Sequence, residues 1–442
     1  MSLLVVGCNH RSADLPLLER LAVPAAELPK ALASLTALEH VQEAVVLSTC
    51  NRVEIYASVS RFHPGLQELR GWLAERGDIH PQDLDDLQYS YHDDRAAAHL
   101  FAVAGGLDSM VVGERQIAMQ VKQVMEIARE EGTARRVLQR LFRQAVRVGR
   151  RVRSDTAIGS GASSMVDVGL DVAAERLGSS LTDRHVLLVG AGKMGGLTAQ
   201  RLVDEAAGRI DVWNRSEDKA DRLAQRTGGR VIAPGGLADA VAAADLVVCT
   251  TGAAEPVLDL DLVLGALQAR RDAAGPQVQP LVLLDLAMPR NVDPRCHDLP
   301  GVEVVDIADV RRLVATDAGR VRNDRGVTGE VVAAARAIVD EEADRFVAWT
   351  RAGEVEPTIR DLRRTAEQIR DAELERLSGK LSTLDPRQRE AVEALTRGIV
   401  NTLLHQPTVR LKELADRTGA DGHAAALRDL FGLDAAEPDL DA

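Results

Sequence analysis

The stretch from residue 185 to residue 195 reads HVLLVGAGKMG and decides the fold in the middle of this chain. Its first five residues form a short apolar run typical of a buried strand, and a Gly-x-Gly-x-x-Gly loop follows that opens a helical pattern. Glycines in this setting permit a tight turn and let backbone amides approach a pyrophosphate at the amino terminus of a helix. Further apolar runs at 209–213, 245–250 and 281–285 supply more strands. The sequence therefore predicts a Rossmann-type α/β unit between residues 156 and 306.

The glycine loop and the end of the second strand form the predicted cofactor site. A site that prefers NAD holds an acidic residue there for the ribose diol, about 20 residues beyond the glycines. This chain has an arginine and a hydroxyl instead, which suit a 2′-phosphate, so the predicted cofactor is NADPH. The predicted contacts are Gly190, Ala191, Gly192, Lys193, Met194, Gly195, Asn214, Arg215 and Ser216.

Length and composition exclude several classes of protein. A chain of 442 residues suggests about three domains. The net charge of −13 argues against indiscriminate nucleic-acid binding, because phosphate contacts need clustered lysine and arginine. The four cysteines, at positions 8, 50, 249 and 296, show no metal-ligand spacing, so we expect reduced thiols and no metal. No run of 18 uncharged apolar residues occurs and no basic leader precedes the first strand, which predicts a cytoplasmic protein without a membrane partner.

A first α/β domain is predicted to end near residue 155, because strand and helix patterns alternate along it. The predicted strands cover 3–8, 44–48 and 53–59, and the predicted helices cover 16–40, 65–76, 93–104 and 114–131.

Cys50 lies where the second of these strands gives way to a loop, within LSTCNRVEIYA at 47–57. Taken alone, it would be a small apolar residue at the end of a buried strand. Its neighbours Thr49, Asn51 and Arg52 are poor core residues, however. Arg52 can also supply positive charge that raises the thiolate fraction of a thiol whose ordinary pKa is about 8.5. The pattern predicts a nucleophilic thiol.

Eight arginines and no acidic residue occur between residues 135 and 153. At 100° per residue they fall within an arc of roughly 160°, opposite an apolar arc, so the segment predicts an amphipathic helix with a guanidinium face. Such a face is either a solvated surface or a contact for nucleic-acid phosphates. The sequence leaves both interpretations open.

From residue 307 the chain is predicted to be helical, with one long helix over 307–351. Apolar residues then recur at helical steps within 359–384 and 392–403, and such stripes need a partner surface. Packing within one chain and pairing between two chains both meet that need. The Asp- and Ala-rich tail at 431–442 is predicted to be disordered.

Three separated blocks of the chain resemble the glutamyl-tRNA reductase family. They are GCNHRSA at 7–13, STCNR at 48–52 and GLDSMVVGE at 106–114, the last followed by Gln116 and Gln120. With the glycine loop and the carboxy-terminal helices, the resemblance covers nearly the whole chain. It implies a catalytic domain at 1–155, an NADPH-binding domain at 156–306, and a spinal helix with a helical dimerisation domain at 307–430.

The resemblance also implies an activity, which is the reduction of glutamyl-tRNA(Glu) to glutamate 1-semialdehyde by NADPH at the start of tetrapyrrole synthesis. Cys50 would form a thioester with the glutamyl group, and His99 would orient or activate it. A homodimer is implied, and a glutamate-1-semialdehyde aminomutase is a further expected partner. Arg52 would bind the substrate carboxylate and Glu114 its ammonium group. The implied substrate-binding residues are Thr49, Asn51, Arg52, Ser109, Glu114, Arg115, Gln116 and Gln120.

Two departures and two rival interpretations qualify this resemblance. Asp14 and Leu15 precede the proline that the family more often has directly after the alanine, and Met119 replaces a small residue. One rival is a dehydrogenase of the shikimate kind with Cys50 incidental, which leaves the first 155 residues and the helical tail unexplained. The other is a non-catalytic RNA-binding or regulatory protein that senses NADPH, against which the Thr-Cys-Asn-Arg block argues.

Overall fold

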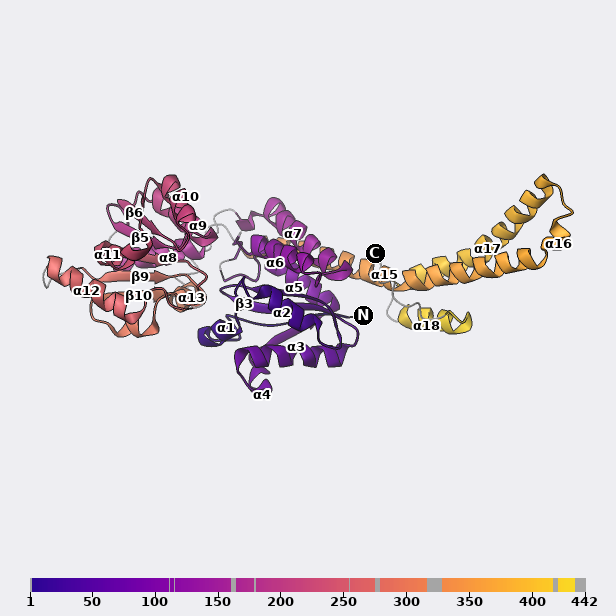
Figure 1. The fold of residues 1–442 in the computed structure, drawn as a ribbon, viewed down its shortest axis with the longest axis horizontal. Helices are drawn as coiled ribbons and strands as arrows, with labels where there is room; N and C mark the ends of the chain where they lie inside the picture. The colour runs from indigo at the N-terminus through magenta and orange to yellow at the C-terminus, as the bar shows by residue number, and fades with distance from the viewer. Residues whose placement is uncertain are drawn as a thin grey trace. The chain divides into compact units, whose positions relative to one another are not determined.

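The computed structural model divides the chain into two compact units, Met1–Glu341 and Glu342–Ala442 (Figure 1). It describes residues 2–110, 112–114, 116–159, 164–178, 180–253, 255–274, 279–315, 328–415 and 420–433. Within these ranges, none of the helices combines the length and the apolar character needed to cross a membrane.

The first unit opens with an antiparallel sheet whose strand order is β2-β3-β1-β4. The strands are β1 (Ser2–Asn9), β2 (Val41–Ser48), β3 (Arg52–Val59) and β4 (Tyr89–His92). The central strand β3 is buried along its whole length. The helices around the sheet are α1 (Leu15–Leu21), α2 (Leu28–Thr36), α3 (Phe62–Gly77), α4 (Pro81–Leu84), α5 (Asp93–Gly105), α6 (Gln116–Glu130) and α7 (Arg136–Asp155).

Two details of this sheet domain differ from the sequence expectation. The single helix expected over 16–40 is two helices, because Ala22 leaves helical geometry and Pro24 disfavours helix at the residue before it. The short strand β4 was not predicted, since its alternation of half-buried and exposed residues covers only four positions, which is too short a signal.

Helix α7 is amphipathic as predicted. Its apolar arc is buried, and the buried residues include Val137, Leu138, Leu141, Phe142, Ala145, Val148 and Val152. The exposed arginines of the segment are Arg135, Arg136, Arg143, Arg147 and Arg150. The amino terminus of the helix is fixed by the buried Glu43 of β2, whose carboxylate accepts backbone N–H groups from three residues of this turn. A carboxylate there also complements the helix dipole.

The rest of the first unit is a six-stranded parallel sheet of order β10-β9-β8-β5-β6-β7, which confirms the Rossmann-type prediction. The strands are β5 (His185–Val189), β6 (Arg209–Trp213), β7 (Arg230–Val231), β8 (Leu246–Cys249), β9 (Leu281–Asp285) and β10 (Val302–Asp306). The helices are η1 (Ala157–Gly159), α8 (Met165–Arg176), α9 (Lys193–Asp204), α10 (Glu217–Thr227), η2 (Pro234–Gly236), α11 (Leu237–Ala243), α12 (Leu260–Ala274), η3 (Pro294–Asp298) and α13 (Ile307–Ala315).

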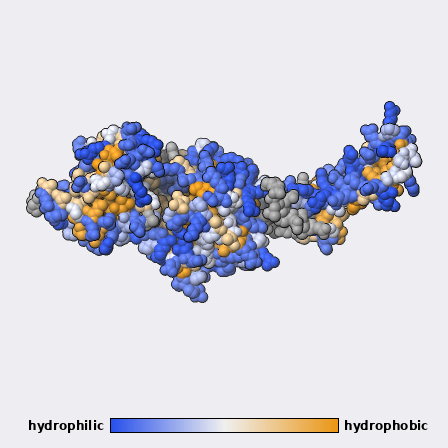
Figure 2. Space-filling model, viewed as in Figure 1, coloured by the Kyte–Doolittle hydropathy of each residue, from blue (hydrophilic) through white to orange (hydrophobic). Residues whose placement is uncertain are grey.

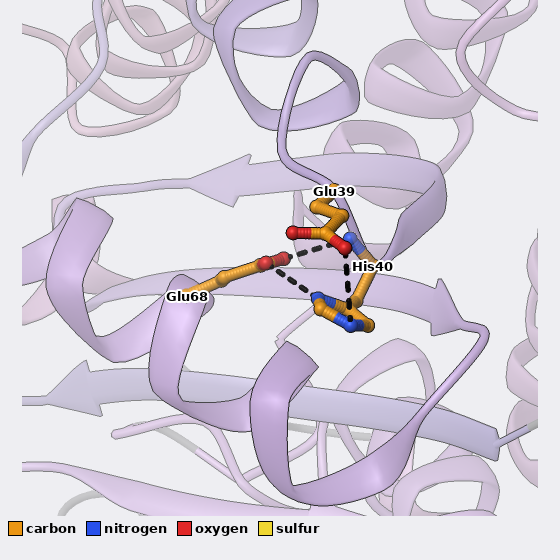
Figure 3. A group of neighbouring side chains, drawn as sticks. All are labelled: Glu39, His40 and Glu68. Atoms are coloured by element: carbon orange, nitrogen blue, oxygen red, sulfur yellow. Dashed lines mark hydrogen bonds and ion pairs between the residues drawn. The ribbon is translucent and has the colours of Figure 1, made fainter.

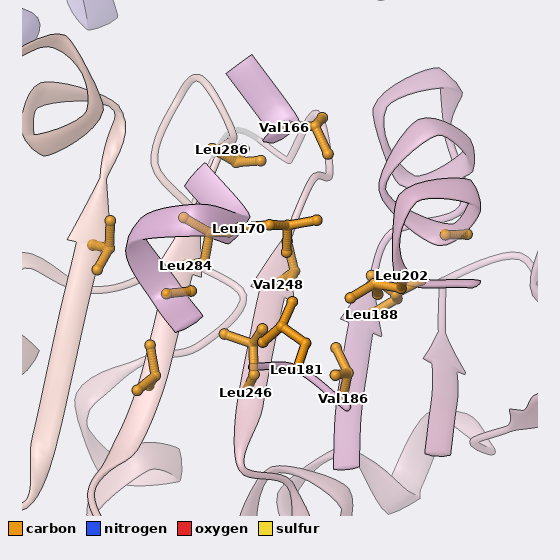
Figure 4. Close-up of a cluster of buried hydrophobic side chains, with 14 of the residues drawn as sticks. Val166, Leu170, Leu181, Val186, Leu188, Leu202, Leu246, Val248, Leu284 and Leu286 are labelled. Atoms are coloured by element: carbon orange, nitrogen blue, oxygen red, sulfur yellow. The ribbon is translucent and has the colours of Figure 1, made fainter. Parts of the chain in front are cut away.

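Alternate residues of these strands enter two different cores. Val186 and Leu188 belong to the cluster drawn in Figure 4, whereas Leu187 and Val189 belong to a second cluster. A strand that contributes to a core on each side of the sheet is buried on both faces, as parallel sheets require. This double burial explains why the strand sequences are continuous apolar runs.

Helix α13 packs with the parallel sheet. Ile307 and Val310 belong to the same core cluster as the residues of β5 and β8. The domain that holds the parallel sheet, called the nucleotide unit from here on, therefore includes α13 and continues to residue 315, past residue 306 where the sequence analysis ended it. The expected single helix over 307–351 is described as α13, which ends at Ala315, and α15, which begins at Gly329; residues 316–327 lie outside the described ranges.

The second unit is helical, as predicted. It contains most of α15 (Gly329–Arg376), then α16 (Ser378–Leu381), α17 (Pro386–Ala415) and α18 (Ala420–Leu430). Small apolar clusters join these helices, one around Val355, Ile359 and Leu411. Leu433 packs with Leu362 and Leu404, so the tail predicted to be disordered from 431 is packed through residue 433. Residues 434–442 lie outside the described part.

Only part of the predicted apolar stripe is covered within the second unit. Ile369, Leu395, Ile399 and Leu403 expose 50 to 69% of their surface. Apolar surface is visible near the turn of the α15–α17 hairpin (Figure 2). The two expectations for the stripe, packing within the chain and an apolar face left for a partner, are thus met by different residues.

Candidate functional site

The predicted nucleophile lies in a tight turn between two antiparallel strands. Thr49 donates its backbone N–H to the Arg52 carbonyl at 2.9 Å, and the Asn51 N–H reaches the Thr49 hydroxyl at 3.2 Å. The backbone N–H of His10, at the end of β1, binds the Asn51 carbonyl at 2.9 Å. Cys50 is half-buried and packs against the apolar core of the nucleotide unit. Thr49, Cys50, Asn51 and Arg52 are therefore held in one turn by these hydrogen bonds.

Arg52 is held by protein carboxylates. Its side chain is 2% exposed, and Nη1 lies 2.7 Å from Glu54 Oε1 and 3.0 Å from Asp108 Oδ2. Nη2 donates to the Asp108 backbone carbonyl. Both terminal nitrogens are engaged by the protein, so the described geometry does not present the free bidentate fork that we predicted for the substrate carboxylate.

Glu54 is the centre of this buried network. Besides Arg52, its carboxylate accepts the hydroxyls of Tyr56 at 2.6 Å and Tyr89 at 2.5 Å, and lies 2.8 Å from His99 Nε2. Burial alone would raise the pKa of Glu54, but the neighbouring Arg52 and His99 together hold it well below its ordinary value. The group is a stable anion that links β3, β4 and α5.

His99 on α5 is fixed by this anion and by two aromatic rings. Its ring centre lies 5.4 Å from that of Tyr89 and 5.0 Å from that of Tyr91. His99 also lines a cavity of about 390 Å³ with Arg95, Asp108 and Arg336. In the described ranges no hydrogen bond or ion pair joins His99 to Cys50, so its action on the thiol stays a prediction.

The loop after α5 places Glu114 near the thiol. Gly106 has φ of 76°, and its carbonyl accepts the Gly113 N–H at 3.0 Å, which folds the loop back on itself. Glu114 is buried, and burial raises its pKa to about 7. Its charge in turn raises the pKa of Cys50.

The other predicted pocket residues are also partly enclosed. Ser109 is 7% exposed. Gln116 opens α6, with Gln120 one turn later, and both are half-buried. The Gln116 side-chain amide nitrogen is buried and has no hydrogen-bond partner among the described residues. Arg115 lies outside the described residues.

The Cys50 thiol is protonated at neutral pH in this arrangement. Burial raises its pKa to about 12, and Glu114 adds to the rise. Arg311 lowers the pKa, and Arg52 does so to a smaller extent. Arg311 belongs to α13 and donates from Nη2 to the Cys50 carbonyl at 2.9 Å and to Asn51 Oδ1 at 3.3 Å.

Sequence reasoning missed both His10 and Arg311. Burial and the nearby Arg311, Arg11 and Arg52 lower the pKa of His10 to about 4, so its ring is neutral near pH 7. His10 Nδ1 is buried and has no hydrogen-bond partner in the part of the chain that the structure describes. His10 was recognised only as part of the GCNHRSA block, and the pairing of its strand with β3 was the signal that could have placed it. Arg311 had no comparable signal, because it is 261 residues from Cys50.

The glycine loop has the geometry of a pyrophosphate cradle. Gly190 has φ of 117°, and a Cβ built on Gly195 would lie 2.1 Å from the Gly190 carbonyl oxygen, so a side chain is excluded there. The loop leads from β5 into α9, at the point where the strand order reverses between β5 and β8. Backbone amides at a helix start in that position fit a nucleotide diphosphate.

The residues at the end of β6 divide into two kinds. Asn214 accepts the Ala191 N–H at 3.1 Å and donates to the Ser216 carbonyl at 2.9 Å, so it ties the glycine loop to the next turn. Arg215 and Ser216 are exposed. Lys193 of the loop binds the Gln123 side chain at 2.8 Å, and Met194 packs on the core. The exposed Arg215 and Ser216 fit a phosphate on the ribose better than Asn214 does.

A third cluster, Glu39, His40 and Glu68, brings together ligand types that metals use (Figure 3). The Glu68 carboxylate, however, binds His40 Nδ1 at 2.7 Å and the His40 backbone N–H at 3.0 Å. Glu39 is 86% exposed and lies 4.0 Å from the other ring nitrogen. We interpret the cluster as a hydrogen-bonded clasp between α3 and the residue before β2, and we assign no metal to it.

We predict that Glu114→Gln speeds alkylation of Cys50 by iodoacetamide. At pH 8 the Glu114 carboxylate is ionised and opposes the thiolate, so its removal should raise the rate about 3- to 10-fold. Below pH 6 Glu114 is protonated, so the alkylation rates of the variant and the wild type should become equal. Rates come from mass spectrometry of the Cys50 peptide. Glu126→Gln, on the exposed side of α6, is the matched control. Equal rates at pH 8 would show that the Glu114 charge does not act on Cys50.

Comparison with known proteins accounts for the whole chain. Family models match glutamyl-tRNAGlu reductase, N-terminal domain, at residues 6–156, its dimerisation domain at 334–433, and shikimate / quinate 5-dehydrogenase at 171–313. A glutamyl-tRNA reductase from Salinispora arenicola is 44% identical and aligns with 98% of this chain and 92% of its own length. One from Frankia alni is 40% identical and aligns with 100% and 99%. The solved structure of glutamyl-tRNA reductase from Methanopyrus kandleri is 31% identical, with a TM-score of 0.51 over 98% of this chain and 99% of that one. The chain therefore belongs to the glutamyl-tRNA reductase family.

Proposed function

We propose that this chain reduces glutamyl-tRNA(Glu) to glutamate 1-semialdehyde with NADPH, through a thioester on Cys50, and so catalyses the first step of tetrapyrrole synthesis. One observation carries the proposal: Cys50 lies in a polar turn and packs directly against the core of the nucleotide unit. A thiol in that place can accept the acyl group within the sheet domain and lies next to the domain that would bind the hydride donor. Membership of the family, whose named relatives are glutamyl-tRNA reductases, supports the same activity.

The first step is acyl transfer to sulfur. The glutamyl group on tRNA is an ester, so Cys50 attacks an already activated carbonyl, the sulfur–carbon bond forms, and the bond to the ribose oxygen breaks. The ribose oxygen leaves with a proton and the tRNA is free. A thioester carbonyl is more electrophilic than the ester it replaces. When that carbon is reduced, the Cys50 thiolate leaves and the aldehyde is released.

The cofactor site has residues suited to NADPH. The Gly190–Gly195 loop would hold the pyrophosphate, and Arg215 with Ser216 would hold the 2′-phosphate. NADPH, when bound there, supplies the hydride for the reduction.

The enclosed polar groups near Cys50 would hold the glutamyl moiety. Glu114 is the proposed partner of the ammonium group, and the Gln116 amide, which has no partner among the described residues, would donate to the substrate. The buried Glu54 keeps His99 in one orientation. His99 would then contact the acyl group from the cavity that it lines with Arg95 and Asp108.

Two larger surfaces complete the proposal. The dimerisation-domain match covers the exposed apolar residues of α17, so we propose that two chains pair there. The exposed arginines of α7 would contact tRNA phosphates. Delivery of the aldehyde to an aminomutase stays a prediction.

Incubation with glutamyl-tRNA in the absence of NADPH should leave a glutamyl adduct on Cys50. Mass spectrometry of the intact protein and of the Cys50 peptide detects the adduct, and addition of NADPH should convert it to a trapped aldehyde. Cys50→Ser should form no aldehyde, because an oxygen ester is a poorer acceptor and leaving group. Deacylated tRNA is the control. A folded enzyme that forms neither adduct nor aldehyde while the tRNA stays charged would favour a small-molecule dehydrogenase instead.

The substitution Arg215→Ala should weaken the binding of NADPH without affecting the binding of NADH. A charge-assisted contact to a phosphate contributes about 1.5–3 kcal/mol, so the KM for NADPH should rise roughly 10- to 100-fold. Steady-state kinetics with both cofactors measures the change. Arg222→Ala, an exposed arginine of α10, should leave both values unchanged. An unaltered ratio in the Arg215 variant would refute the assignment of the 2′-phosphate site.

Replacement of Arg147 and Arg150 by Gln should weaken tRNA binding. Both side chains are exposed, and in the described part of the chain neither has a hydrogen bond or ion pair. The slope of log affinity against log salt should fall by about 0.9 for each duplex phosphate that the variant no longer neutralises. Filter binding at several salt concentrations gives the slope. The control is Arg360→Gln with Arg363→Gln, which makes the same charge change on α15. Identical slopes in the two double variants would show that the exposed arginines of α7 are solvated and do not contact tRNA phosphates.

A further inference from the structure

Arg311 is a half-buried cation beside the nucleophile, and in the described structure it has no ion pair with a carboxylate. Its Nη2 donates to the Cys50 carbonyl at 2.9 Å and to Asn51 Oδ1 at 3.3 Å. Its Nε–H is buried, and among the described residues it has no acceptor. Within the same ranges no carboxylate oxygen lies within 4.0 Å of its nitrogens, and Asp306, just before α13, acts on it only from farther away. A partly desolvated guanidinium of this kind is unfavourable unless an anion joins it in part of the working cycle.

The other arginines nearby have their charge satisfied. Arg52 pairs with Glu54 and Asp108, so its positive charge is largely compensated within the sheet. Arg312, the next residue along α13, is 78% exposed and pairs with Asp309. Arg311 is therefore the cation near Cys50 whose charge is available to a new anion.

We propose that Arg311 is a positioning residue that supplies the positive charge for the anion formed at Cys50. The anion is the thiolate that attacks the acyl group and leaves again after reduction. The inference rests on the proposed function only in taking Cys50 as the nucleophile. Since Arg311 belongs to α13 of the nucleotide unit, the charge reaches the thiol only while that helix contacts the Cys50 turn.

The charged and titratable groups around the thiol give this role to Arg311. Glu114, before α6, opposes the thiolate when ionised. His10, at the end of β1, is neutral near pH 7. Arg52, at the start of β3, is neutralised by Glu54, and Arg311 lowers the pKa of Cys50 more than Arg52 does. Removal of the Arg311 charge leaves burial and Glu114 to oppose ionisation.

Two substitutions separate the charge of Arg311 from its hydrogen bonds. Arg311→Gln keeps a donor for the Cys50 carbonyl but removes the charge, whereas Arg311→Lys keeps the charge and loses the planar fork. The full-length enzyme is treated with iodoacetamide at pH 8, and alkylation of Cys50 is followed by mass spectrometry of its peptide. Loss of a nearby opposite charge shifts a pKa by about 1 unit or more, so the Gln variant should react about 10-fold more slowly. The Lys variant should stay within about threefold of the wild type, as should the control Arg312→Gln.

Other outcomes overturn the inference. A Gln variant that reacts at the wild-type rate or faster shows that the charge is not used, and faster reaction points to a loosened turn. Equal slowing in the Gln and Lys variants assigns the effect to the hydrogen bonds alone. The assay contains neither tRNA nor NADPH, so its result is separate from the proposed function. If the Gln variant is alkylated more slowly but the wild type forms no glutamyl adduct, the role of Arg311 stands. The proposed reductase mechanism is then rejected.

Discussion

The buried pair of Arg52 and Glu54 is the interaction on which the catalytic domain depends. Two charges within a sheet are tolerable only when each is fully paired, because uncompensated ions in a low-dielectric interior are very unfavourable. Glu54 meets this condition with donors from Arg52, Tyr56, Tyr89 and His99. These donors come from two strands and a helix. The turn that carries Cys50 is therefore fixed to α5 by electrostatics and not only by apolar packing.

The sequence predicted the structure best where the local conformation or burial restricts which residues can occupy a position. The Gly190–Gly195 loop could be predicted because its conformation excludes side chains, and β5 could be predicted because burial on both faces demands a continuous apolar run. The break between α1 and α2 and the packing of α13 were missed. In the first case an apolar pattern continued across Pro24. In the second, an apolar helical stripe does not reveal which core it joins.

The candidate site shows the same division. Thr49, Asn51 and Arg52 could be proposed as site residues because they are next to Cys50 in the sequence. The ion pairs of Arg52 were not predicted, because the sequence alone does not show which carboxylates lie near an arginine in the folded protein. Here the first partner, Glu54, is two residues away on the same strand, and the second is the distant Asp108. Contacts such as that of Arg311 with the turn depend on tertiary structure alone.

The sheet domain and the nucleotide unit are joined by the same kind of ion pair that holds the thiol turn, but by one that water reaches more easily. Within the sheet, Arg52 and Glu54 are almost completely removed from water. Between the sheet domain and the nucleotide unit, Arg290 forms a bidentate ion pair with Glu19 at 2.8 and 2.7 Å, and the two side chains are 25% and 15% exposed. A bidentate arginine–carboxylate pair fixes the orientation of both partners even where water reaches part of it. The joint between the two domains is therefore directional, whereas the network around the thiol is also closed to water.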